Sequence, residues 1–204
     1  MDRSELVRWN GELYQLLLRC YAQVSILEEM ERHNTETAER SKGMINASQA
    51  VVEQMGIAVR GELILNLWKL YFDPDKTSRT LLNYRANLRK FLRENLIFVN
   101  IKKRKCTPLM IELGDEIVYM REQYLTRLTP PERVDMQFLQ RVKKVLEIIR
   151  GQFNETCRSE IDDVLLPLNS AELKKQQFTT TLGLGWMLEH SKIERNNPEK
   201  EEYT

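Results

Sequence analysis

Imidazole and thiol groups, which suit acid–base, nucleophilic and metal chemistry near neutral pH, are rare in this sequence. The 204 residues include two histidines, His33 and His190, and three cysteines, Cys20, Cys106 and Cys157. Neither histidine has a serine, cysteine or aspartate at a spacing that suggests a catalytic triad or a metal site. Three dispersed cysteines favour reduced thiols in the cytoplasm over a disulfide framework.

The short motifs of common catalytic and nucleotide-binding sites are also missing from the sequence. It contains no G-x-x-x-x-G-K-[ST] or G-x-G-x-x-G phosphate loop, no H-E-x-x-H zinc motif and no G-x-S-x-G nucleophile elbow. We therefore predict no catalytic residue, no bound metal and no cofactor from motifs alone.

Phosphate binding is one chemistry that is open to the charged residues. The chain has 31 basic and 30 acidic residues, so its net charge of +1 gives no general attraction to nucleic acid. Residues 79–105 are nevertheless locally basic. The only dense basic run is Lys102-Lys103-Arg104-Lys105, and Arg85 and Arg89 share a helix face four residues apart. These six side chains are candidate phosphate contacts, and a solvated loop before a helix is the alternative for the run.

Apolar residues recur every three or four positions along most of the chain, which predicts amphipathic helices. The first stripe runs from Leu6 to about Met30, where we expect the first helix to end, and the polar residues 35–42 form either a loop or a solvated helical turn. Further stripes cover residues 45–70, 81–92, 109–124 and 134–153. Residues 96–99 are ambiguous between a continued helix and a short strand. We therefore expect an all-α, up-and-down bundle of about five helices.

Several polar residues and prolines mark the ends of these helices. Pro74 disfavours helix at Asp73 and should end the second helix. Thr77 or Ser78 is expected to cap the third helix. The fourth helix should begin at the pair Thr107-Pro108, and the segment Thr129-Pro130-Pro131-Glu132 is the strongest helix start in the chain. Gly56 and Gly61 interrupt the second stripe, which indicates either a close helix approach or a kink.

The domain organisation follows from where these patterns fade. We predict a helical bundle over residues 1–168, a partly helical extension over 169–194 and a disordered tail over 195–204. The first residues lack the apolar core of a signal peptide, and no window is apolar enough to cross a membrane. The apolar but glycine-broken segment Leu182–Leu188 is a candidate docking segment.

Two segments, taken in order, resemble a known family. One helix ends in LWKLYFDP at residues 67–74, and MREQYLTRLTP at residues 120–130 precedes a strongly capped helix. This order, over roughly half of the chain from Val59 to Arg150, resembles the HEPN superfamily and its AbiU-type abortive-infection branch. Members of this branch have a similar Asp-Pro turn, followed by an Arg-x(4–6)-His motif.

The resemblance implies a homodimer whose motif arginines and histidines meet across a cleft and cleave RNA without a metal. Arg121 matches the motif arginine, but Arg127 stands at the histidine position and Thr129 at the position of a following aspartate. A guanidinium stays protonated at neutral pH and so cannot act as the acid or base of this reaction, although it can bind phosphate. The resemblance therefore implies a degenerate, non-catalytic member in which Arg121 and Arg127 bind phosphate. The alternative is that both are ordinary surface arginines.

Three functional hypotheses remain open. The leading one is a non-catalytic HEPN-like helical protein that binds RNA, a nucleotide or a partner protein, in the phage-defence or toxin–antitoxin setting that the resemblance implies. The second is an active metal-independent ribonuclease that uses His33 or His190. The third is a helical scaffold that docks on a partner through Leu182–Leu188.

Overall fold

The computed structural model describes residues 2–40, 47–97, 106–126 and 134–157, together with residues 171, 173–175, 179–180 and 183. Every regular element among these residues is a helix. The elements are α1 (Arg3–Arg40), α2 (Ala47–Leu67), α3 (Leu81–Glu94), α4 (Pro108–Thr126) and α5 (Met136–Cys157). A π-helical turn, η1 (Trp68–Phe72), continues α2 directly. The predicted all-α bundle is therefore confirmed.

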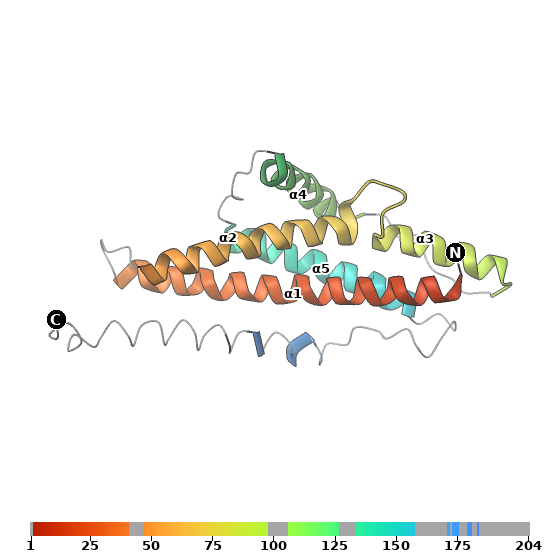
Figure 1. Cartoon of the computed structure of the whole chain (residues 1–204), viewed down its shortest axis with the longest axis horizontal. Helices are drawn as coiled ribbons and strands as arrows, with labels where there is room; N and C mark the ends of the chain where they lie inside the picture. Colours follow the sequence, from red (N-terminus) through yellow and green to blue (C-terminus); the bar gives the residue numbers. More distant parts are fainter. Residues whose placement is uncertain are drawn as a thin grey trace, which may run out of the picture.

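Figure 1 shows how the helices are layered. The long helix α1 packs against α2 and α5, and its first turns lie near α3. Helix α4 lies across α2 from α1, where it contacts α2, η1 and α5. The outward side of α4 is therefore one surface of the bundle, and η1 lies where α2 meets α4.

The apolar stripes of the first and fifth helices enter the hydrophobic core as predicted. Their buried members are Leu6, Leu13, Leu17, Cys20, Val24 and Leu27 on α1, and Val134, Phe138, Val142, Val145, Ile149 and Phe153 at α5. Burial raises the pKa of the Cys20 thiol well above its usual value, so this thiol stays protonated. The third stripe differs, because Leu82 of α3 is exposed.

Helix α1 is longer than its apolar stripe. The stripe ends at Met30, which is buried, but the helix continues to Arg40. Residues 35–40 therefore belong to the helix rather than to a loop. Arg32 and Glu29 form an ion pair of 2.7 Å across one helical turn, an interaction that supports a helix without apolar packing. The expected end near Met30 was wrong, because polar residues can continue a helix that has already been nucleated.

Helix α3 is capped by a different residue from the ones predicted. The Thr80 hydroxyl accepts a hydrogen bond of 3.2 Å from the Asn83 N–H, so Thr80 is the N-cap. Thr77 and Ser78 instead bond to Asp75 within the loop. The Thr77 hydroxyl donates to the Asp75 carboxylate at 2.9 Å, and the Ser78 hydroxyl donates to the Asp75 carbonyl at 2.7 Å. The prediction of Thr77 or Ser78 was wrong because this local turn uses both side chains.

The end of α3 has a strained backbone. Leu96 has a φ of 57°, in the left-handed region that favours glycine. The Leu96 N–H donates to the Arg93 carbonyl at 3.3 Å, and the Ile97 N–H donates to the Leu92 carbonyl at 2.9 Å. This pattern is a Schellman motif, which ends a helix. Residues 96–97 are therefore neither helix nor strand, and residues 98–99 lie outside the described part of the chain.

Replacing Leu96 by glycine should stabilise the protein. Leu96 is 79% exposed, so its side chain contributes little packing, and glycine adopts a positive φ without the clash of a Cβ. We expect Leu96→Gly to raise the free energy of unfolding by about 1 kcal/mol, measured by urea denaturation. Leu82→Gly, at an exposed position inside α3, is the matched control and should lower it by about 1 kcal/mol or more. A destabilised L96G variant would contradict the assignment of strain.

The described part of α5 begins later than expected. Residues 129–132, the strongest predicted helix start, lie outside the described residues, but Val134 and Asp135 are not helical. The Asp135 carboxylate accepts a hydrogen bond of 2.7 Å from the Phe138 N–H and so caps α5. The prediction of one helix running on from residue 130 was therefore wrong at these two positions, because a second capping residue begins the helix there.

The C-terminal part of the chain is described only at a few positions. The described residues between 171 and 183 are helical, and Leu173 is buried with the hydrophobic core. The predicted tail at 195–204 and nearly all of Leu182–Leu188 lie outside the described residues. None of the described helices has the length and apolar character needed to cross a membrane.

Candidate anion-binding site

Arg121 has an unusual environment for a charged side chain, because it is half-buried against an aromatic ring. It lies on α4, and its guanidinium carbon is 3.9 Å from the centre of the Trp68 ring in η1. Its Nε is buried and has no hydrogen-bond partner. No ion pair or hydrogen bond joins the guanidinium to any residue that the structure describes. Among the described residues, the aromatic face and not an acidic group therefore holds Arg121 in place.

The π-helical turn orients Trp68. The Asp73 N–H donates to the Trp68 carbonyl at 2.9 Å, five residues back, and Pro74 then prevents the helix from continuing. Leu70 and Tyr71 of this turn are buried, whereas Trp68 is half-buried against α4. The extra residue in the turn thus presents the indole at the α2–α4 contact. π-turns inside helices are rare and occur frequently at functional sites.

Two glycines allow α4 to approach α2 and η1 closely enough for this contact. A Cβ on Gly114 would lie 2.8 Å from Cδ1 of Phe72, and a Cβ on Gly61 would lie 2.8 Å from Cζ of Tyr124. Both distances are shorter than any ordinary carbon–carbon contact. Close approach therefore accounts for Gly61, one of the two glycines that interrupt the second apolar stripe.

No family model matches the chain, and no curated protein or solved structure matches it either. The chemistry of this site therefore rests on its own geometry.

Arg85 and Arg89, predicted as phosphate contacts, lie in different surroundings. Arg85 is only 3% exposed; it donates hydrogen bonds to the Gln152 carbonyl and, at 3.3 Å, to the Glu155 carboxylate of α5. Arg89 is half-buried, and burial together with the positive charges of Arg85 and Arg93 lowers its pKa. The buried Arg85 links α3 to α5, whereas Arg89 and Arg93 lie closer to solvent.

The remaining predicted site residues do not join this site among the described residues. The run Lys102–Lys105, Arg127 and His190 lie outside the described part of the chain. His33 lies half-buried near the end of α1. No group of three His, Cys, Asp or Glu side chains that could hold a metal ion is found among the described residues.

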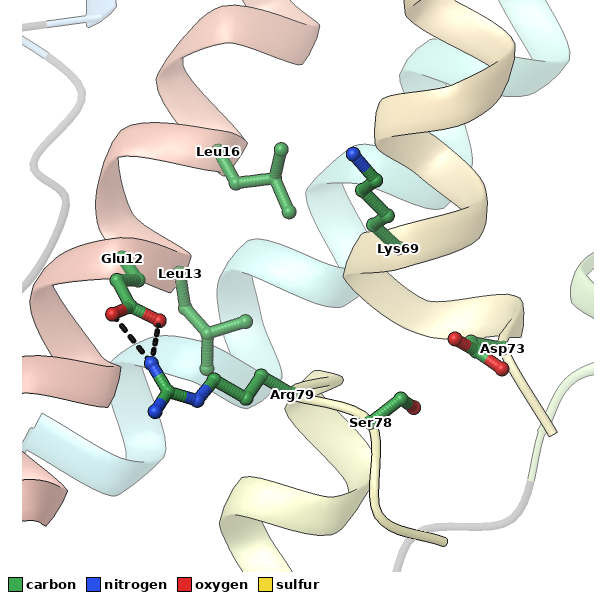
Figure 2. Close-up of a pocket in the computed structure, with 7 residues that line it drawn as sticks. All are labelled: Glu12, Leu13, Leu16, Lys69, Asp73, Ser78 and Arg79. Atoms are coloured by element: carbon green, nitrogen blue, oxygen red, sulfur yellow. Dashed lines mark hydrogen bonds and ion pairs between the residues drawn. The ribbon is translucent and has the colours of Figure 1, made fainter. Parts of the chain in front are cut away.

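A separate pocket lies between α1, η1 and the loop before α3 (Figure 2). Its volume is about 260 Å³, and it is lined by Glu12, Leu13, Leu16, Lys69, Asp73, Ser78 and Arg79. The Arg79 guanidinium pairs with the Glu12 carboxylate at 2.6 and 2.7 Å, as the dashed lines show. Two acidic and two basic side chains balance one another here, so this pocket has less attraction for an anion than Arg121 has.

The sequence points to Arg121 but not to its aromatic partner or to this pocket. Trp68 is one residue of the LWKLYFDP segment, and nothing in that segment marks it as the partner of Arg121. The arrangement of Arg121 over Trp68 depends on how α4 lies on η1, and no spacing within one helix encodes it. The pocket likewise combines residues from three segments.

Filling the space at Gly114 should displace α4. We expect Gly114→Ala to lower the free energy of unfolding by about 1–3 kcal/mol, because its Cβ would collide with the Phe72 ring. Gly151→Ala on α5 is the matched control, since nothing lies within 4 Å of its Cβ, and it should raise stability by up to about 1 kcal/mol. Thermal unfolding followed by circular dichroism measures both. Equal stabilisation in the two variants would contradict the close approach.

Removing the buried Arg85 should also be costly. Arg85→Met keeps most of the volume but removes the guanidinium hydrogen bonds to the Gln152 carbonyl and the Glu155 carboxylate. We expect the free energy of unfolding to fall by about 1.5–3 kcal/mol, measured by urea denaturation. Arg93→Met, at an exposed position of the same helix, should change it by less than about 0.5 kcal/mol. Similar values for both variants would show that Arg85 is not a structural link.

Proposed function

We propose that this protein is a non-catalytic, HEPN-like helical protein that binds RNA through phosphate contacts at Arg121. The observation that carries this proposal is the Arg121 guanidinium, which lies over Trp68 and has no acidic partner among the described residues. A charge left unneutralised but held in one orientation is suited to bind an anion. The homodimer and the phage-defence or toxin–antitoxin setting belong to the proposal through the resemblance to the HEPN superfamily.

The contact between Arg121 and Trp68 supports the resemblance as well as the ligand class. The two segments that resemble the family are distant in sequence, yet they meet at this contact. A guanidinium is planar, and stacking on an aromatic ring fixes the orientation of that plane, whose N–H groups match two oxygens of a phosphate. Stacking on an indole contributes about 0.5–2 kcal/mol to holding that plane.

The absence of a catalytic role follows from proton chemistry. Attack by a ribose 2′-hydroxyl needs a group that accepts a proton near neutral pH, and imidazole is the side chain best suited to this task. Arg127 stands where the family has its histidine, and a guanidinium stays protonated. We therefore propose binding without cleavage.

Loss of Arg121 should weaken RNA binding in a salt-dependent way. We expect Arg121→Ala to raise the Kd for a fluorescently labelled single-stranded RNA by about tenfold or more at low salt, measured by anisotropy. The slope of log K against log salt concentration should fall in magnitude by about 0.7, the value for one lost phosphate contact on a single strand. Arg121→Lys should retain part of the affinity, because its charge remains but its planar fork does not.

Lys144→Ala is the matched control, since Lys144 is an exposed cation on α5, and it should leave both values unchanged. An unchanged Kd in R121A, or no RNA binding by the parent protein, would overturn the proposal. RNA cleavage that is lost in His33→Ala or His190→Ala would replace it with the ribonuclease hypothesis.

A fluorescence measurement tests the site itself. Trp9→Phe combined with Trp186→Phe leaves Trp68 as the only tryptophan. RNA that binds at Arg121 should then change the fluorescence emission of Trp68, and the midpoint of this titration should agree with the Kd measured by anisotropy. Binding without any change in emission would put the RNA elsewhere.

A further inference from the structure

The outward face of α4 is both acidic and apolar. Its exposed residues are Ile111, Glu112, Asp115, Tyr119, Glu122 and Leu125. Ile111 is 56% and Tyr119 is 60% exposed, which is unusual for large apolar side chains on one helix face. Neither Glu112 nor Asp115 forms an ion pair with another described residue. The only basic residue of α4 is Arg121, which lies at the edge of the helix against Trp68.

The outward face of α3 has the opposite charge. Leu82, Ala86, Lys90 and Arg93 are exposed, and the half-buried Arg89 lies beside them. The helix contains a single acidic residue, Glu94, which is within 3.8 Å of Lys90. Leu82 and the small Ala86 lie one turn apart, so a partner's apolar side chains can reach the helix between the cations.

We propose that these two faces bind each other between two copies of this chain, with α4 of one copy packed along α3 of the other. Opposite charges attract, and burying the exposed apolar residues of both faces adds to the association. In a two-fold dimer this contact occurs twice, because the symmetry that places α4 of one copy on α3 of the other also places α3 of the first copy on α4 of the second. The helices span 14 and 19 residues, so several turns of each can be matched.

The charges favour a second copy over nucleic acid as the occupant of the α4 face. An acidic helix face repels phosphates, so RNA and the outward face of α4 are poor partners. The charged residues on the two faces are complementary, and the apolar residues lie among the charges rather than apart from them. This assignment of the surface rests on the proposed homodimer, and it does not depend on RNA binding.

Reversing the charge of each face separately tests the proposal. One variant carries Glu112→Lys and Asp115→Lys on α4, and the other carries Lys90→Glu and Arg93→Glu on α3. Each variant alone should self-associate at least about tenfold more weakly than the parent protein, because both of its faces then have the same sign. Sedimentation equilibrium measures the association, and circular dichroism verifies the fold.

An equimolar mixture of the two variants is the decisive measurement. In the mixed dimer, both α3–α4 contacts again join opposite charges. The basic α3 of the α4 variant meets the acidic α4 of the α3 variant, as in the parent protein, and the altered, basic α4 meets the altered, acidic α3. The mixture should therefore recover association within a few-fold of the parent protein. Lys76→Glu combined with Lys144→Glu lowers the net charge by the same amount as the α3 variant, at exposed positions off both faces, and it should leave self-association unchanged.

The outcomes separate this proposal from the proposed function. If the parent protein is a dimer, and the α3 variant and the α4 variant each dimerise as tightly as the parent, then the proposed α3–α4 interface is wrong and the homodimer stands. If the mixture does not recover association, the α3–α4 pairing is wrong. If the parent protein is monomeric at high micromolar concentration, both the homodimer and this surface are overturned. RNA binding is measured separately through Arg121.

Discussion

The close packing of α4 against η1 is the constraint on which the candidate surfaces of this bundle depend. Two glycine positions let aromatic rings lie directly on a helix backbone, Gly114 under Phe72 and Gly61 under Tyr124. This approach brings Arg121 onto the ring of Trp68. It also turns the acidic and apolar side of α4 outward. The same contact therefore holds the anion-binding candidate and exposes the surface that we assign to a second copy.

The arginines of this protein illustrate how one side chain serves different purposes in different surroundings. Arg85 is buried and donates hydrogen bonds to Gln152 and Glu155, so it stabilises the α3–α5 contact. Arg79 is paired with Glu12 at the surface. Arg121 has neither kind of partner among the described residues and lies against an aromatic ring. Only the last arrangement leaves a fixed positive charge for a ligand.

Sequence periodicity predicted the helices far better than their ends. The stripes on the first and fifth helices are buried almost residue for residue, because burial against a core requires the helical repeat. Ends depend on which of several polar side chains reaches a free N–H. Thr80 caps α3 although Thr77 and Ser78 are equally suited by type, since Asp75 already engages both of those. Asp135 caps α5, but the sequence favours a helix start at residues 129–132, where the capping pattern is stronger.

The sequence by itself determined the all-α class, the main apolar faces and the choice of Arg121 as a phosphate-binding candidate. The first two follow from residue type and from spacing within one helix, and the choice of Arg121 follows from the resemblance to the HEPN superfamily. The tertiary structure alone decided that Trp68 supports Arg121, that Arg85 is buried and that α3 and α4 present faces of opposite charge. Each of these depends on how helices pack on one another, and the relative placement of two helices is not contained in the periodicity of either.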